Sequence, residues 1–251
     1  LIAQAWSVLS GAAPPEMQRG AMVSVETHLV DHVADLIKLL DPPLVNATPS
    51  AGYIQAYPPG VRENGGQYSH GAVWALMAQA QLATSDPELS DRRELPYRYF
   101  TYLSPAHRSQ NPAYGSDYGL EPYVMAGDVY TQAPYAGRGG WSWYTGAAAW
   151  MHRAAIESLF GLQQTAETLS FAPCLPAAWQ RADLTLTREE KTMHFVLLRL
   201  GTAEALDAVA PMAASVLLPG EPLRWMSLAA ETHFVIPLVG HDAQSTATKM
   251  Q

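Results

Sequence analysis

The chain changes character near residue 165, and this change limits the folds that it can adopt. Before that position, apolar residues recur at helical spacing in segments separated by loops rich in glycine and proline. After it, short runs of β-branched and aromatic residues alternate with turn residues. The pattern predicts a mainly α-helical region over 1–165, a small antiparallel β domain over 166–240 and a polar tail over 241–251.

The first region should consist of helices joined by two long loops. Its clearest helix is SHGAVWALMAQAQLAT at 69–84, with Ser69 as the expected N-cap. A second long helix is expected over 142–160, ended by Gly161. Further helices are expected at 1–10, 15–31, 91–103 and 122–130. The expected loops are 41–67 and 104–120.

Charge and composition exclude several functions. The formal net charge is −8 and no basic run occurs, which argues against nucleic-acid binding. No apolar run is long enough to cross a membrane. Cys174 is the single cysteine, so no internal disulfide can form, and a buried structural role is expected for it. These features suggest a cytoplasmic protein.

Neither the start of the chain nor its histidines add a further function. The opening LIAQAWSVLSGA is typical of a helix interior, so we expect a fragment whose upstream part is missing. His28 and His32 are spaced as a helical metal pair, but no third ligand is evident. We therefore expect these two residues on a solvated helix face, and no metal site anywhere in the chain.

Aromatic residues and glycines gather in the middle of the chain. All 12 tyrosines lie between residues 53 and 144, a region whose long loops also hold most of the glycines. Such loops are typical of a binding site, although they could also cover the ends of a helical array. Flat aromatic faces suit the apolar faces of sugar rings, and charged groups can bind the hydroxyls. The candidate sugar-binding residues are Tyr57, Arg62, Glu63, Gln67, Glu121, Asp128, Arg138 and Trp143.

Three of these candidates are carboxylates, and more than one role is open to each. Glu63, Glu121 and Asp128 could act as an acid or a nucleophile in cleaving a glycosidic bond. Each could equally accept hydrogen bonds from sugar hydroxyls or pair with Arg62 or Arg138. Binding or structural roles are favoured for all three.

Two expected helix starts could hold an anion. His70 lies at the start of one helix, and Thr145 and Gly146 lie at the start of another. Free N–H groups and the positive end of the helix dipole favour anions at such positions. We therefore predict that His70, Thr145 and Gly146 share one oxyanion, such as phosphate.

Three segments resemble the glycoside phosphorylases of glycoside hydrolase family 94. They are YPPGVRENGGQYSHGAVWAL, EPYVMAGDVY and GRGGWSWYTGAAAWMHRAAIESLFGL. The branch most similar to them comprises the carboxy-terminal phosphorylase-like region of cyclic β-1,2-glucan synthases and the free-standing 1,2-β-oligoglucan phosphorylases. The resemblance covers about residues 1–200. It implies the C-terminal portion of an (α/α)6 barrel, followed by a small antiparallel β domain.

The resemblance also implies a reaction and a division of the site. The reaction is inverting phosphorolysis of β-1,2-glucans to glucose 1-phosphate, with inorganic phosphate as co-substrate and no cofactor. His70, Thr145 and Gly146 would bind phosphate, and Arg62 and Glu63 would contact sugars. The general acid would be an aspartate in the missing upstream part of the same polypeptide, because no matching Trp-Asn-Asp segment occurs here. No residue of this chain is then catalytic.

The resemblance leaves some questions open. Where relatives tend to have Leu-Asn-Pro-Ile-x-His, this chain has LSPAHRS at 103–109, so the pairing of that loop is not defined. The chain could instead belong to a non-catalytic module that binds β-glucan and controls chain length, or to an inverting glucan hydrolase. The longer parent that the resemblance implies could place the chain at the cytoplasmic side of the inner membrane, and the chain could form a homodimer.

Overall fold

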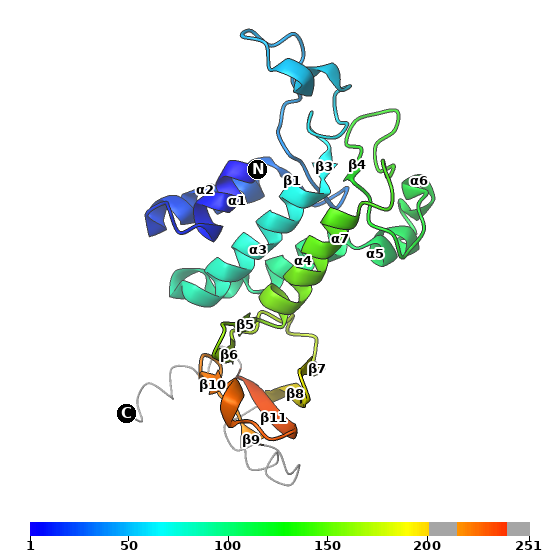
Figure 1. Ribbon diagram of the computed structural model, residues 1–251. Coiled ribbons are helices and arrows are strands. Elements are labelled where there is room, and N and C mark those ends of the chain that lie inside the picture. The colour runs from blue at the N-terminus through cyan, green and yellow to red at the C-terminus, as the bar shows by residue number, and fades with distance from the viewer. Residues whose placement is uncertain (201–214, 240–251) are drawn as a thin grey trace. The chain divides into compact units, whose positions relative to one another are not determined.

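The computed structural model describes residues 1–200 and 215–239 (Figure 1). Their contacts divide the chain into two compact units, Leu1–Leu159 and Phe160–Gln251. The first unit contains most of the helices, and the second contains short sheets. The expected polar tail at 241–251 lies outside the described residues.

The first unit is organised around one buried helix, α3 (Ser69–Ser85). Alanines recur along α3, and most of its residues are buried on all sides, which allows neighbouring helices to approach closely. Helices α1, α2, α4 and α7 all contact it, as Figure 1 shows for α4 and α7. The helices that accompany α3 are α1 (Ile2–Leu9), α2 (Pro15–His28), α4 (Glu94–Leu103), α5 (Pro105–Gln110), α6 (Gly115–Tyr118) and α7 (Thr145–Arg153). Short helical turns lie at Gly52–Ala56, Pro87–Arg92 and, as a π-helical turn that continues α7, Ala154–Leu159.

Tryptophans connect three of these helices. The ring of Trp74 on α3 lies edge-to-face with Trp6 of α1, with ring centroids 5.5 Å apart, and with Trp150 of α7 at 5.7 Å. Such pairs contribute about 0.5–1.5 kcal/mol beyond the area that they bury. They fix α7 against α3, and therefore the start of α7 relative to the start of α3.

Two pairs of short strands hold the loops of this unit. Strands β1 (Val30–Asp31) and β2 (Leu36–Ile37) pair antiparallel after α2. Strands β3 (Gln67–Tyr68) and β4 (Asp128–Val129) also pair antiparallel, although 59 residues lie between them in the sequence. The second pair brings together two aromatic loop regions, 57–70 and 121–146.

The structure corrects several expected elements of the first unit. The expected helix at 122–130 is turns followed by β4, because Pro122 and Gly127 disfavour a helix and Asp128 bonds to a distant segment. The expected loop at 104–120 contains α5 and α6, and Pro105 begins α5 at a position that favours proline. The N-cap of α3 is Tyr68 rather than Ser69.

The second unit contains two small sheets. In the first, β6 (Thr168–Phe171) pairs antiparallel with β5 (Leu162–Gln164) and β10 (Leu223–Arg224). The second has the strand order β7-β8-β11-β9. Its strands are β7 (Arg181–Arg188), β8 (Lys191–Leu200), β9 (Ser215–Val216) and β11 (Glu231–Val239). A short helical turn, Trp225–Ser227, follows β10.

The expectation of a purely antiparallel domain is wrong. β11 pairs in parallel with both β8 and β9, and only β7 and β8 are antiparallel neighbours in this sheet. The chain from residue 201 to 230 is long enough for the crossover that parallel strands need. Phe195 and Phe234, partners in the register, stack on the buried face with ring centroids 5.3 Å apart.

The described helices close no barrel. None of them is long and apolar enough to cross a lipid bilayer.

Candidate active site

Backbone hydrogen bonds tie the two aromatic loop regions together where α3 begins. Ser69 N donates to Gly127 O at 3.0 Å, and the Ser69 hydroxyl donates to Ala126 O at 2.6 Å. On the other side, Tyr144 N donates to Met125 O at 3.0 Å. The segment 125–127 therefore lies between the starts of α3 and α7 and bonds to both.

This arrangement brings His70 against Gly146. A Cβ atom at residue 146 would lie 2.9 Å from His70 Nε2, closer than ordinary contacts allow, so a larger residue there would displace the imidazole. His70 belongs to the first turn of α3, and Thr145 and Gly146 belong to the first turn of α7. No side chain caps either helix start. Three residues expected to share an anion thus meet at two uncapped helix N-termini.

Two tyrosines brace the imidazole of His70. Tyr68 stacks on it with ring centroids 5.8 Å apart, and Tyr144 meets it edge-to-face at 5.3 Å. The two phenol oxygens lie 3.1 Å apart in a hydrogen bond. Burial, followed by this hydrogen bond, raises the pKa of Tyr68, so the phenol stays protonated and can donate.

The environment of His70 favours its neutral form. Burial lowers the pKa of the imidazole, and Nδ1 is buried without a hydrogen-bond partner. No carboxylate pairs with the ring within the described part of the chain. A bound anion would supply the missing negative charge and favour the protonated form.

Arg62 and Glu63 form a charged pair near the same tyrosines. Arg62 Nε lies 3.4 Å from Glu63 Oε2, and neither of these buried atoms has a hydrogen-bond partner. The Arg62 guanidinium also lies over the ring of Tyr57, 5.5 Å from its centroid. Both charged groups are close enough to Tyr68 to affect its pKa. Arg62 Nε and Glu63 Oε2 are therefore available to hydrogen-bond a ligand next to the ring of Tyr57.

Two of the predicted sugar-binding residues are buried and bonded to the protein instead. Gln67 is 1% exposed, accepts from Ile37 N at 2.8 Å and donates to Tyr102 O at 3.2 Å. Asp128 is 2% exposed and accepts from Arg62 N at 2.7 Å. Burial raises the pKa of the Asp128 carboxyl. The structure therefore gives both residues a role in positioning the loops.

The remaining sugar-binding candidates, Glu121, Arg138 and Trp143, are exposed. Trp143 is 66% exposed and meets the exposed ring of Tyr123 edge-to-face at 6.4 Å. Glu121 is exposed. Arg138 is also exposed, lies over Tyr135 and lines a cavity of about 560 Å³ with residues of α6. The structure does not bring Glu121 and Arg138 into the His70 cluster.

Tyr144 of this cluster escaped the sequence-based prediction, and Tyr68 was noted in the sequence only as one residue of the aromatic loop before α3. The available signal was their position, directly before the helix starts that carry His70 and Thr145. Arg108, in the segment LSPAHRS at 103–109, is another residue whose role the sequence did not predict. It is 1% exposed, donates to Asp35 O at 2.7 Å and lies over Tyr114 at 4.5 Å. Its role is therefore to hold the loop after β1.

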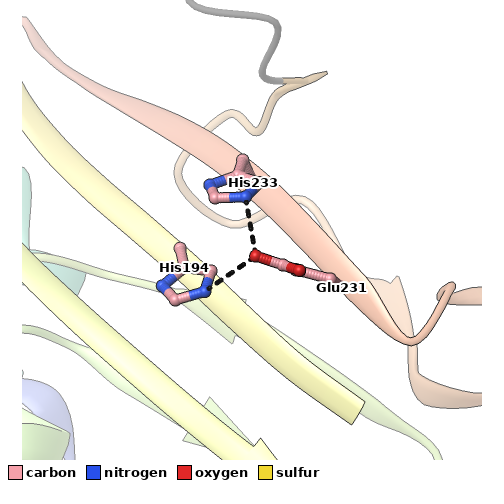
Figure 2. Close-up of side chains that lie close together, drawn as sticks. All are labelled: His194, Glu231 and His233. Carbon is pink, nitrogen blue, oxygen red and sulfur yellow. Dashed lines mark ion pairs between the residues drawn. The ribbon is translucent and has the colours of Figure 1, made fainter.

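The structure confirms the prediction for Cys174 but not the one for His32. Cys174 is buried, as predicted. His32 does not share a helix face with His28, because α2 ends at His28, and its ring bonds to Glu26 and Tyr102. In the second unit, His194 and His233 lie beside Glu231, although no metal site is expected from the sequence (Figure 2).

Comparison with known proteins places the chain in a family of carbohydrate-active enzymes. Residues 1–161 match the Glycosyl hydrolase 94 superfamily, catalytic domain, so the chain belongs to this family. It is 42% identical over 178 residues to the cyclic beta-(1,2)-glucan synthase NdvB of Rhizobium meliloti (strain 1021), covering 71% of this chain and 6% of that protein.

Two phosphorylases are also similar. The solabiose phosphorylase of Paenibacillus borealis is 28% identical over 73% of this chain and 22% of its own length. The N,N'-diacetylchitobiose phosphorylase of Vibrio proteolyticus is 26% identical over 87% of this chain and 25% of its own length. The chain therefore spans a quarter or less of these relatives and is related to glycoside phosphorylases.

Proposed function

We propose that the chain is the C-terminal part of a catalytic domain that performs inverting phosphorolysis of β-1,2-glucans. In this proposal, inorganic phosphate attacks the anomeric carbon as the glycosidic C–O bond breaks. An aspartic acid from the upstream part of the same polypeptide protonates the leaving oxygen. The products are α-glucose 1-phosphate and a glucan shortened by one residue.

The contact between His70 and Gly146 is the observation that carries this proposal. It joins two uncapped helix starts at one place, next to a phenol that can donate a hydrogen bond. Inorganic phosphate is an anion at neutral pH and accepts several hydrogen bonds, so it suits such a place. Gly146 allows close approach to the backbone, and the Thr145 hydroxyl supplies a further donor.

The sugar would bind next to the phosphate. Arg62 and Glu63 supply a donor and an acceptor for hydroxyl groups, and Tyr57 and Trp143 supply apolar faces for the rings. The relatedness to the glucan synthase favours a β-1,2-linked glucan as the substrate. The small share of each relative that the chain spans supports an upstream part, with which its helices would complete an (α/α)6 barrel.

Release of glucose 1-phosphate by the longer parent polypeptide tests this proposal. We expect release from β-1,2-glucooligosaccharides only when phosphate is present, and slower or no release from solabiose and diacetylchitobiose. Free glucose released without phosphate would instead identify a hydrolase. Glucan binding without turnover, unaffected by phosphate, would identify a binding module, and either result would overturn the proposal.

The variant His70→Gln tests the assignment of the phosphate site. It should raise the KM for phosphate at least about tenfold, because a hydrogen bond to a charged group contributes about 1.5–3 kcal/mol. The matched control is His28→Gln, at an exposed position on α2, which should leave the KM unchanged.

A further inference from the structure

The sheet of the second unit carries a cluster of three metal-binding side chains. His194 lies on β8, and Glu231 and His233 lie on β11, as Figure 2 shows. One ligand atom from each residue lies within 4.8 Å of the others. We propose that this cluster binds a divalent transition-metal ion of the Zn²⁺ type, outside the phosphorolysis site.

The strand register explains why the three side chains meet. β8 and β11 pair in parallel, with His233 directly opposite His194. Glu231 lies two residues before His233, and side chains two apart in a strand point to the same face. The two imidazole rings stack with centroids 4.6 Å apart and an interplanar angle of 14°. The cluster thus rests on strands with extended, regular pairing rather than on a loop.

The distances suit a shared ion better than direct bonding. Glu231 Oε1 lies 3.7 Å from His194 Nε2 and 3.5 Å from His233 Nε2. A charge-assisted hydrogen bond would bring such atoms to about 2.7–2.9 Å. Ligands at about 2.0–2.2 Å from a tetrahedral Zn²⁺ ion lie about 3.4 Å from one another. Both histidines face the same carboxylate oxygen, so an ion beside that oxygen would be within reach of both Nε2 atoms after small rotations of the stacked rings.

A neighbouring hydroxyl favours the tautomer of His194 that can bind a metal through Nε2. Thr185 of β7 lies opposite His194 in the antiparallel register, and its Oγ1 lies 3.1 Å from His194 Nδ1. With the proton on Nδ1 and donated to Thr185, the Nε2 lone pair is free for a metal. Metal-binding histidines usually have such a partner at their second nitrogen.

The donor set selects among metals. Two imidazole nitrogens and one carboxylate suit Zn²⁺ and related transition metals, whereas Mg²⁺ and Ca²⁺ require oxygen ligands. Glu231 and His233 are exposed, which leaves further coordination positions to water. The ion would join β8 to β11 across the connection at 201–230, and binding to the folded state alone would raise its stability.

Zn²⁺ titration of the tag-free 251-residue chain, in competition with a chromophoric chelator, tests this inference. We expect one Zn²⁺ per chain and a rise in Tm with Zn²⁺ but not with Mg²⁺. The double variant H194N/H233N should lose Zn²⁺ affinity at least about 100-fold, and Thr185→Val about tenfold, as for supporting residues elsewhere. The control His28→Asn should bind as the unchanged chain does.

Other outcomes would overturn the inference. They are Zn²⁺ binding by H194N/H233N within threefold of the unchanged chain, or equal binding of Mg²⁺. If the double variant fails to fold, Glu231→Gln replaces it, since this change keeps the size of an exposed side chain. Glu231→Gln should weaken Zn²⁺ binding at least about tenfold because it removes the anionic ligand, and unchanged affinity would contradict the proposed site.

Discussion

At the scale of single residues, the contact between His70 and Gly146 has the clearest consequence. Alanine at position 146 would place its Cβ 2.9 Å from His70 Nε2 and displace the imidazole. We predict that Gly146→Ala in the longer polypeptide raises the KM for phosphate at least about tenfold, measured by glucose 1-phosphate release.

The matched control for this change is Gly20→Ala. Gly20 is exposed within α2, and nothing lies within 4 Å of a Cβ atom at this position. This change should stabilise the chain by about 0.5–1 kcal/mol and leave the KM unchanged. Equal effects of the two substitutions on phosphate use would contradict the role of Gly146.

His70 should also make stability depend on pH. Burial lowers its pKa in the folded chain below the value of about 6.5 typical of an unfolded chain. The unfolded state therefore takes up the proton first, and stability falls as the pH drops below about 6.5. We predict that His70→Gln loses less stability between pH 7 and pH 5 than the unchanged chain, measured by urea unfolding. An identical loss in both proteins would argue against burial of the imidazole.

Arg108 tests the structural importance of a buried cation. Arg108→Met keeps the apolar stem but leaves Asp35 O and Tyr102 O without their donor. The loss should be about 2–4 kcal/mol of the free energy of unfolding, measured by urea unfolding. Arg181→Met, which removes a surface ion pair with Asp183, should have little effect. A small effect of Arg108→Met would show that the buried bonds contribute little.

At the scale of elements, the start of α3 depends on its bond to the segment before β4. Ser69→Ala removes the buried hydrogen bond to Ala126 O and should cost about 1–2 kcal/mol of the free energy of unfolding. Ser85→Ala removes an exposed bond to Gln81 O and is the control. The two variants can be compared by urea unfolding, and equal losses would contradict the importance of this bond.

The elements that the sequence predicted best are those that local patterns determine. Helix α3 has a long apolar segment of good helix formers, and the β-rich runs mark most strands of the second unit. The segment 122–130 was predicted poorly, because its structure depends on pairing with Gln67 and Tyr68. The order of β8 and β11 depends likewise on partners far along the chain.

The site residues, like the elements, divide into those with a local sequence signal and those that depend on distant contacts. His70, Thr145 and Gly146 could be named as candidates because each lies at a helix start, which is a local signal. Gln67 and Asp128 look like ligand-binding residues in sequence, but tertiary contacts with Ile37 and Arg62 give them structural roles. His194 and His233 become neighbours only through the parallel register, which no local pattern reveals.

At the scale of the whole molecule, the chain combines part of a family 94 catalytic domain with a separate sheet unit. The first unit contains the proposed phosphate-binding residues but, in our account, lacks the general acid. We therefore predict no turnover by the 251-residue chain alone, and turnover by the longer parent polypeptide, measured as glucose 1-phosphate release. Phosphorolysis by the chain alone would show that it contains its own acid.

The position of bound phosphate tests the central claim most directly. A crystal structure of the parent polypeptide with inorganic phosphate should show the anion within hydrogen-bonding distance of both His70 Nε2 and the first turn of α7 at Thr145 and Gly146. Phosphate bound elsewhere, with this place occupied only by water at a saturating concentration, would contradict the account.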